Sequence, residues 1–272
     1  MSLESTIRQI SGAVLPQAVR FGLRRLLFSG DRKRCPLCGS AVRTFIAHGG
    51  SASVLERRQV VGGMKRLDDA CPACHGGDRA RLKMLYLEQV LLTEGRRKRI
   101  LHVAPEFGLY QRLKREPNID YVATDLDQTR YRHIPELVTA DLTDLPFETA
   151  SFDAVICSHV LEHVPDDRKA MSEIRRVLAP SGTALLMVPL ATDGLGTDED
   201  LTVTNARERD ERYGQYDHLR LYGREDFAAR LESVGFEVGY FNGFDQFPAL
   251  ADKLWLNPRE NLILARPRAS VG

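Results

Sequence analysis

The sequence predicts an α/β protein, with a parallel sheet covered by helices on both faces, preceded by a small β-rich module and helices. The first observation is that short apolar strands alternate with helical stretches from about residue 100 onward. The second is that several of these strands are apolar on both faces, as in parallel sheets buried on both sides. The third is that two Cys-x-x-Cys pairs enclose a strand-rich stretch near the N-terminus.

The composition is that of an ordinary globular protein. The chain has 272 residues, of which 43% are apolar and 28% charged, enough for one domain with an appendage or for two modest domains. Its apolar runs fall short of the roughly 20 residues that span a bilayer. The N-terminus lacks the pattern of a secretory signal. We therefore expect a cytoplasmic protein without a transmembrane segment.

The charge is divided unevenly between the two parts of the chain. Residues 1–99 contain 19 of the 38 basic residues but only 8 of the 37 acidic residues. Such a basic front suits RNA, an acidic lipid surface or an anionic substrate, and it also suits a surface that faces the acidic remainder of the chain. The oligomeric state is left open by this pattern.

Three segments are expected before residue 99. Residues 1–30 form an N-terminal helical segment, because apolar residues recur at near-helical spacing, with Pro16 as an interruption. Residues 31–77 form the β-rich module, with strands near 42–47 and 54–61 between glycine turns. Residues 78–98 form a linking helix that ends near Gly95.

The module contains the ligands of a structural metal site. The four ligands are Cys35, Cys38, Cys71 and Cys74. Each Cys-x-x-Cys pair offers two sulfurs from one tight turn, and four thiolates complete a tetrahedral shell around Zn²⁺ with no open position. We therefore predict structural Zn²⁺, with His48 and His75 as spare candidates. The fifth cysteine, Cys157, closes an apolar strand and is expected in the core.

The second part of the chain, residues 99–272, contains the alternating elements. Strands are predicted at 100–104, 121–124, 137–140, 154–157, 184–188, 237–241 and 261–265. Helices are predicted at 110–116, 168–178 and 227–234. The polar, irregular segment 191–221 is expected to overhang the site, because ligands of open parallel sheets bind beyond the carboxyl ends of the strands.

Three stretches of this part resemble a known family. They read YVATDLD, TADLTDLPFETASFDAVICSHVLEHVPDDRKAMSEIRRVLAPSGTALLMVP and GQYDHLRLYGREDFAARLESVGFEV. They are similar to the motifs of class I S-adenosylmethionine-dependent methyltransferases, of the methyltransferase type 11 kind. The resemblance covers about residues 97–267. It implies a Rossmann-like seven-stranded methyltransferase sheet over residues 99–272, S-adenosylmethionine as cofactor, and a zinc ribbon as the preceding module.

The resemblance also implies the cofactor-binding residues. Asp125 ends the second strand, 19 residues after Glu106, where an acid meets ribose hydroxyls. Asp141 resembles the acid that accepts from the adenine amino group, with the amide and side chain of Leu142 at the ring. Ser158 and His159 lie at the positions where members of the family contact the methionine part of the cofactor. The predicted set is Glu106, Gly108, Asp125, Leu126, Asp141, Leu142, Ser158 and His159. Helix capping, a turn and a structural histidine are the alternatives for Asp125, Asp141 and His159.

The first loop departs from the family pattern. His102, Ala104 and Glu106 replace the usual Asp and two glycines, and only Gly108 remains. Glycine at such positions lets the backbone approach the cofactor closely. Glu106 could bind the ammonium group of the cofactor, or the loop could mark a weakened site.

The stretch from His159 to His163 fits H-x-x-E-H, a pattern that also holds catalytic zinc in some peptidases. That reading needs both histidines on one helical face. The strand character of residues 152–157 and the presence of Pro165 leave barely a turn for a helix. The stretch is therefore predicted to be the turn that leaves the fourth strand.

Methyl transfer has no obligatory catalytic signature, because the sulfonium already activates the carbon. The catalytic residues are unknown, with His218 and His159 as candidates. The candidate acceptor contacts in the overhanging segment are Tyr213, Tyr216, His218, Arg220 and Tyr222. Each of them could instead pin this segment to the sheet.

Three functions stay open. The first is a methyltransferase acting on a small-molecule or saccharide-type acceptor. The second is a ribosomal or transfer RNA methyltransferase that binds RNA through its basic zinc module, although residues 29–99 contain only two aromatic residues, Phe45 and Tyr86. The third is a non-catalytic binding protein with a degenerate cofactor loop.

Overall fold

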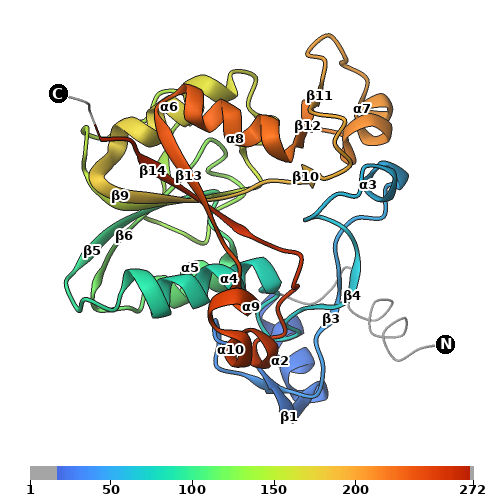
Figure 1. The fold of residues 1–272 in the computed structure, drawn as a ribbon. Coiled ribbons are helices and arrows are strands. Elements are labelled where there is room, and N and C mark those ends of the chain that lie inside the picture. The colour runs from blue at the N-terminus through green and yellow to red at the C-terminus, as the bar shows by residue number, and fades with distance from the viewer. Residues whose placement is uncertain (1–16, 270–272) are drawn as a thin grey trace.

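The centre of the protein is a seven-stranded sheet with the order β13-β14-β9-β8-β5-β6-β7. The computed structural model describes residues 17–269 (Figure 1). The strands are β5 (Lys98–Val103), β6 (Ile119–Asp125), β7 (Val138–Thr139), β8 (Phe152–Ser158), β9 (Leu178–Met187), β13 (Phe236–Phe241) and β14 (Leu262–Pro267). All neighbours pair in parallel except β14, which is antiparallel to both β9 and β13. The predicted seven-stranded sheet is confirmed.

Helices cover both faces of the sheet, because alternate strand residues point to opposite sides. The helices form two groups, one on each face of the sheet. Leu101 and Val155 of the sheet pack against the first group, and Ile100 and Ala154 pack against the second. The first group is α6 (Asp167–Val177) and α8 (Arg224–Ser233). The second is α4 (Asp78–Tyr86) with a π-helical turn (Leu87–Leu91), α5 (Phe107–Leu113), α9 (Gly243–Gln246) and α10 (Pro248–Lys253). Figure 1 shows the two layers above and below the sheet.

The four-cysteine module (residues 29–77) lies beyond the carboxyl ends of the parallel strands (Figure 1). Its strands β1 (Ser29–Arg34) and β2 (Ala41–Val42) form one antiparallel pair, and β3 (Ile46–His48) and β4 (Arg66–Ala70) form another. Helix α2 (Gln17–Leu27) precedes it, within the predicted helical segment. The part of that prediction that falls on residues 1–16 lies outside the described residues.

The predicted strand at 54–61 is wrong. The chain forms the short helix α3 (Ser53–Arg57) there, followed by a turn. The buried side chains of Val54 and Leu55 pack against Tyr213 and Leu221 instead of joining a β-ladder. Tertiary packing on one apolar face has overridden the local β-propensity of this stretch.

The module and the sheet share one apolar core. Phe45 and Cys74 belong to the same buried cluster as Leu109 of α5. The fully buried Arg81 of α4 fastens these parts together, because its guanidinium donates to the carbonyl oxygens of Asp69 at 2.7 Å, Gly76 at 3.0 Å and Leu254 at 2.8 Å. The same guanidinium lies 4.2 Å from the ring centroid of Phe45.

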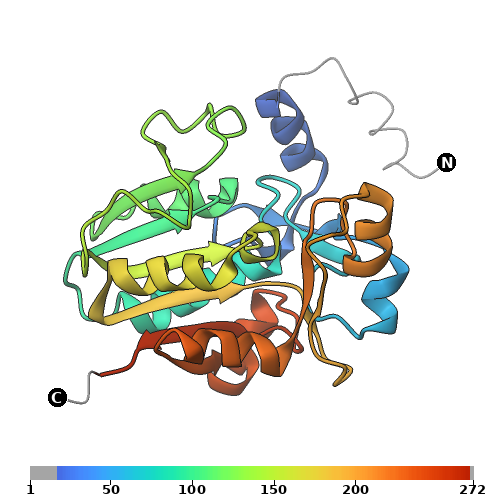
Figure 2. The same ribbon diagram turned by 90° about the horizontal axis from the view of Figure 1, so that it is seen from above.

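The segment 191–221, predicted to be irregular, contains several short elements. They are β10 (Leu190–Ala191), β11 (Asp198–Glu199), α7 (Ala206–Tyr213) and β12 (Arg220–Gly223), and the strands form a small sheet in the order β10-β12-β11. Val61 and Leu190 exchange backbone hydrogen bonds of 2.8 and 3.0 Å, which tie the module to β10. Figure 2 shows α7 beside the module. Between residues 17 and 269, no helix has the length and apolarity needed to cross a membrane.

Candidate active site

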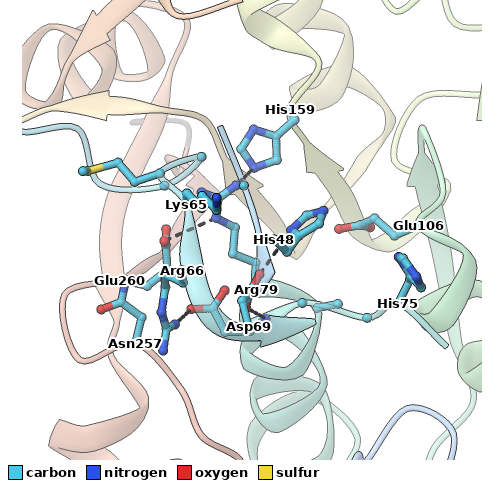
Figure 3. A pocket seen from close by; sticks show the side chains of 18 of the residues that line it. His48, Lys65, Arg66, Asp69, His75, Arg79, Glu106, His159, Asn257 and Glu260 are labelled. Carbon is cyan, nitrogen blue, oxygen red and sulfur yellow. Dashed lines mark hydrogen bonds and ion pairs between the residues drawn. The ribbon is translucent and has the colours of Figure 1, made fainter. Parts of the chain in front are cut away.

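A cavity of about 540 Å³ lies where the module meets the carboxyl ends of the strands. The sheet contributes the loop after β5, with Glu106, Phe107 and Gly108, and the loop after β8, with His159. The module contributes β3, β4 and the 60–65 turn, and the N-terminus of α4 and residues 257–260 complete the wall. Figure 3 shows these side chains converging. The module, and not the segment 191–221, therefore covers the strand ends at this point.

The cavity wall carries many charges, most of which are paired. Arg66 pairs with Asp78, the His48 ring lies 3.2 Å from an Asp69 carboxylate oxygen, and Arg79 lies 3.3 Å from Glu260. Burial, with the neighbouring carboxylates of Asp69 and Glu260, raises the pKa of Asp78 to about 6.

Two cations of the wall stand apart from these pairs. Lys65 and Arg259 are exposed, and neither side chain makes an ion pair within residues 17–269. Two unpaired positive groups on one cavity wall favour an anionic ligand. Sequence patterns gave no sign that residues so far apart in the chain share this wall.

The atypical first loop is held by a buried polar network. The ammonium of Lys83, fully buried on α4, pairs with the Glu106 carboxylate and donates to Ser158 Oγ at 2.7 Å. His102 Nε2 donates to Glu106 Oε2 at 2.8 Å, and His102 Nδ1 accepts from the Tyr121 hydroxyl at 3.0 Å. Burial alone would raise the pKa of Glu106, but the charge of Lys83 and the His102 hydrogen bond hold it well below its usual range.

This network changes the interpretation of two predicted cofactor residues. Because Glu106 already has the Lys83 ammonium as its partner, its carboxylate serves first to fix the loop. Ser158 is buried, and its hydroxyl accepts from Lys83. In place of flexible glycines, this loop has a fixed set of hydrogen bonds. Ala104, which lies between His102 and Glu106, adopts a positive φ of 48°.

Gly108, predicted to lie near the cofactor, also approaches the four-cysteine module. A Cβ atom built there would lie 3.4 Å from Cys74 Sγ and 3.4 Å from Leu37 Cδ1. The close approach that glycine permits is thus made to the module, although Gly108 also borders the cavity.

The acids at the next two strand ends lie where they were predicted. Asp125 ends β6 partly exposed, its Oδ1 accepts from the Asp127 amide at 2.8 Å, and burial raises its pKa. Asp141 is exposed in the turn after β7, and its Oδ1 accepts from the Thr143 amide at 2.8 Å. Both carboxylates are accessible acceptors of the kind that suits ribose hydroxyls and an adenine amino group.

Their neighbours differ from one another. Leu126 is 69% exposed beside Asp125. Leu142 is buried in the apolar cluster that packs under α6 and α8. Burial of this side chain favours the backbone of Leu142 for the predicted contact with the adenine ring.

His159 sits at the cavity wall with a φ of 57° (Figure 3). Its Nε2 accepts from the Arg79 guanidinium, which can only donate. Its Nδ1 must then carry the proton, and it donates to Glu162 Oε1 at 3.1 Å. Burial and the charge of Arg79 lower the pKa of His159, so the ring is neutral and oriented.

The described lining of the cavity lacks the five candidate acceptor contacts, Tyr213, Tyr216, His218, Arg220 and Tyr222. Arg220 is buried and donates to the carbonyl oxygens of Leu161 at 3.0 Å and Pro165 at 2.9 Å. The hydroxyl of the fully buried Tyr222 donates to Asp167 at 2.7 Å. The polar groups of Arg220 and Tyr222 are used inside the protein to hold the turn after β8, which favours the alternative that these residues pin the segment 191–221.

Two others of these residues, Tyr216 and His218, belong to the loop between α7 and β12. Tyr216 is 63% exposed to solvent. His218 is buried, and its Nδ1 donates to the Tyr213 carbonyl oxygen at 3.1 Å, while Tyr213 itself is buried under α3. Burial lowers the pKa of His218, and the residue is absent from the described lining of the cavity.

The four predicted cysteine ligands come together. The Sγ atoms of Cys35 and Cys74 are 3.7 Å apart, those of Cys38 and Cys71 are 3.8 Å apart, and all four lie within 4.8 Å of one another. A tetrahedral zinc ion with Zn–S bonds of about 2.3 Å has sulfurs about 3.8 Å apart. The cluster therefore fits such an ion.

The remaining histidines and the fifth cysteine stay outside this cluster. His48 contacts Asp69, and His75 contacts Arg24. Cys157 is buried in β8, and burial raises the pKa of its thiol. Four sulfurs alone thus make up the predicted shell.

Comparison with known proteins supports the assignment of the sheet. Residues 103–186 match the family model described as "Methyltransferase domain". An uncharacterized protein of Methanocaldococcus jannaschii is 35% identical over 145 residues, which are 53% of this chain and 57% of the relative. A ubiquinone/menaquinone biosynthesis C-methyltransferase of Brucella anthropi is 35% identical over 120 residues, which are 39% of this chain and 46% of the relative. The chain thus covers less than two thirds of either relative.

Among solved structures, a SAM-dependent methyltransferase from Archaeoglobus fulgidus aligns with 70% of this chain and 94% of its own, at 17% identity and a TM-score of 0.44. The strand order, with β14 as the one antiparallel member, and the acids at the ends of β6 and β7 accompany the domain match. The matched residues 103–186 thus form a methyltransferase domain of the class I S-adenosylmethionine-dependent kind.

Proposed function

We propose that the protein transfers a methyl group from S-adenosylmethionine to a small, saccharide-type acceptor that carries an anionic group. The cavity between the module and the strand ends is the observation that carries this proposal. Its wall joins the loops that follow β5 and β8 to the unpaired cations Lys65 and Arg259. Cofactor loops and acceptor-binding groups would then face the same space.

The chemistry asks little of the protein beyond positioning. When bound, the cofactor would supply an electrophilic methyl carbon for in-line attack by the acceptor, with the electron pair of the broken carbon–sulfur bond left on sulfur. Asp125 and Asp141 would hold the adenosine part through its hydroxyl and amino groups. The Lys83–Glu106–His102 network fixes the first loop, and the module covers the strand ends, so this chain would mainly contribute orientation.

The four cysteines would hold structural Zn²⁺. A closed shell of four thiolates leaves no position for substrate, so this ion would stabilise the module and would take no part in methyl transfer. Because Cys74 packs against Gly108, zinc would also fix the shape of the first cofactor loop.

The size and charge of the cavity favour a small acceptor over RNA. A volume of about 540 Å³ lies within the range of small-molecule sites. Lys65 and Arg259 provide two cations for a phosphate or carboxylate group. Arg66 and Arg79, in contrast, are engaged in ion pairs within the protein, which leaves them less suited to the phosphates of a nucleic acid.

A cofactor titration tests the first half of the proposal. Binding of S-adenosylmethionine to the zinc-loaded protein is measured by calorimetry for wild type, Asp125→Asn and the control Asp120→Asn. Asp120 lies near the amino end of the same strand, away from the site. We expect Asp125→Asn to weaken binding at least about tenfold, because one charged hydrogen bond is worth about 1.5 kcal/mol or more, and Asp120→Asn to bind like wild type. Absence of binding to the wild type would exclude both enzyme readings and leave the non-catalytic one.

A labelled-methyl assay tests the acceptor. Sugar nucleotides, other small anionic metabolites, uncharged sugars and RNA are compared. The variant Lys65→Ala/Arg259→Ala should raise KM for the anionic acceptor with little change in cofactor affinity. Arg97→Ala is the matched control, because Arg97 is 70% exposed just before β5, at the opposite end of the sheet. Transfer to RNA alone, with a steep salt dependence, would replace this proposal by the RNA reading.

A further inference from the structure

A second group of metal-ligating side chains lies outside the four-cysteine cluster. Glu162 and His163 come from the turn after β8, which is a 3-10 turn (Leu161–His163), and His218 comes from the loop before β12. One ligand atom from each of the three lies within 4.8 Å of the others. The H-x-x-E-H stretch is therefore used with a third residue 55 positions downstream of His163, and without the helix that a peptidase needs.

Glu162 is unusual within this group. Its side chain is fully buried, and its Oε2 atom has no hydrogen-bond partner in the described part of the chain. A buried carboxylate oxygen without a partner is costly, so it usually marks a missing ion or water. The side chains that face it from the neighbouring elements are the imidazoles of His159, His163 and His218.

The atoms that would not bind a metal are already engaged. His163 Nδ1 donates to the Asp217 carbonyl oxygen at 3.2 Å, and His218 Nδ1 donates to the Tyr213 carbonyl oxygen at 3.1 Å. Because a carbonyl only accepts, both rings carry their proton on Nδ1 and keep the lone pair of Nε2 for a ligand bond. Glu162 Oε1 accepts from His159, which leaves Oε2.

This pattern of outer hydrogen bonds is typical of metal sites, where a ligating histidine donates its other N–H to a carbonyl or carboxylate. The turn itself is fixed, because Arg220 donates to the carbonyl oxygens of Leu161 and Pro165. Two ligands are therefore preset, and His163, which is 29% exposed, has the freedom to close on an ion.

We propose that Glu162, His163 and His218 bind one divalent transition-metal ion. Two imidazoles and one carboxylate suit Zn²⁺, Fe²⁺, Co²⁺ or Mn²⁺, and three protein ligands leave coordination positions for water or another oxygen ligand. The site adjoins the cavity through His159, which hydrogen-bonds Glu162 on one side and lines the cavity on the other. Metal binding here does not depend on the proposed methyl transfer.

Metal stoichiometry tests the proposal on the full-length protein. After purification with zinc in the four-cysteine cluster, the protein is titrated with Co²⁺, followed by equilibrium dialysis, metal analysis and absorption spectra. Wild type should take up one equivalent of Co²⁺ with weak visible bands and without the sulfur charge-transfer bands of a thiolate site. Glu162→Gln and His218→Gln should each lose that equivalent while they keep their zinc.

The controls separate this site from unfolding and from scattered binding. Glu162→Gln removes a buried charge, so it should fold at least as well as wild type, which a thermal melt checks. His133→Gln, which alters an exposed histidine in the loop between β6 and β7, should bind Co²⁺ like wild type. The proposal is overturned if wild type takes up no Co²⁺ equivalent beyond zinc, or if Glu162→Gln and His218→Gln take up as much as wild type.

Discussion

The substitution Lys83→Met is the sharpest test of how the first loop is held. The Lys83 side chain is fully buried, and its ammonium contacts the Glu106 carboxylate and Ser158 Oγ. Methionine fills a similar volume but leaves Glu106 without its cation. Removing one partner of a buried ion pair costs about 3–5 kcal/mol of unfolding free energy.

The structure indicates that the loss of unfolding free energy in Lys83→Met lies near the lower end of this range. The Glu106 side chain is 34% exposed, so solvent screens part of the stranded charge. We therefore expect about 3 kcal/mol, which corresponds to a fall in Tm of roughly 6–12 °C for a chain of this size. Thermal melts are compared at equal zinc and protein concentrations, because bound metal itself shifts Tm.

A second substitution decides whether the stranded charge is the cause. In Lys83→Met/Glu106→Gln the carboxylate is gone, and the Gln side-chain oxygen still accepts from His102. The double variant should recover at least half of the lost Tm. The reasoning is refuted if Lys83→Met melts with wild type, or if the double variant melts no higher than Lys83→Met alone.

Three further predictions follow from other buried groups. Maleimide labelling followed by mass spectrometry should modify no cysteine in the zinc-loaded protein and the four cysteines of the module after chelation of the metal. Cys157 should react only after denaturation, because its thiol is buried and has a raised pKa. Labelling of Cys157 before denaturation would contradict this. Arg220→Lys should lower the unfolding free energy, measured in urea, by about 3 kcal/mol, because an ammonium cannot donate to several carbonyl oxygens at once in the geometry of a guanidinium. Arg207→Lys should have no effect, because the Arg207 side chain is 88% exposed. Equal losses in the two variants would contradict the role of Arg220 in holding the turn after β8. Asp78 has a folded pKa of about 6, above its ordinary 3.8, so its ionisation destabilises the folded state. In urea denaturation, the unfolding free energy of wild type should therefore fall relative to that of Asp78→Asn as pH rises from about 4 to about 6. A difference between the two unfolding free energies that stays constant over this pH range would contradict this.

The sheet was predictable from the sequence because its strands are short apolar runs that need no partner to be recognised. The same holds for the acids Asp125 and Asp141, since the end of a strand fixes the place of the next residue. The metal cluster was equally accessible, because two Cys-x-x-Cys pairs define it locally.

Contacts between distant segments could not be read in the same way. The pairing of Lys83 with Glu106 leaves no local pattern, and neither does the packing of Gly108 against Cys74. Arg220 looks like an anion-binding arginine in sequence, and only the fold shows that carbonyl groups of the turn after β8 use its guanidinium. The module covers the cavity through such contacts, which is why the segment 191–221 was predicted for that place instead.

Because the module and the sheet share one core, the two parts of the chain depend on each other to fold. Arg81 spans the module, α4 and the segment after α10, and Gly108 makes room for Cys74. A foreign module fused to this sheet would have to place two backbone carbonyls as Asp69 and Gly76 do for Arg81, and removal of the module would uncover the side of the cluster to which Leu109 belongs. Truncations that separate the module from the sheet are therefore expected to destabilise both parts.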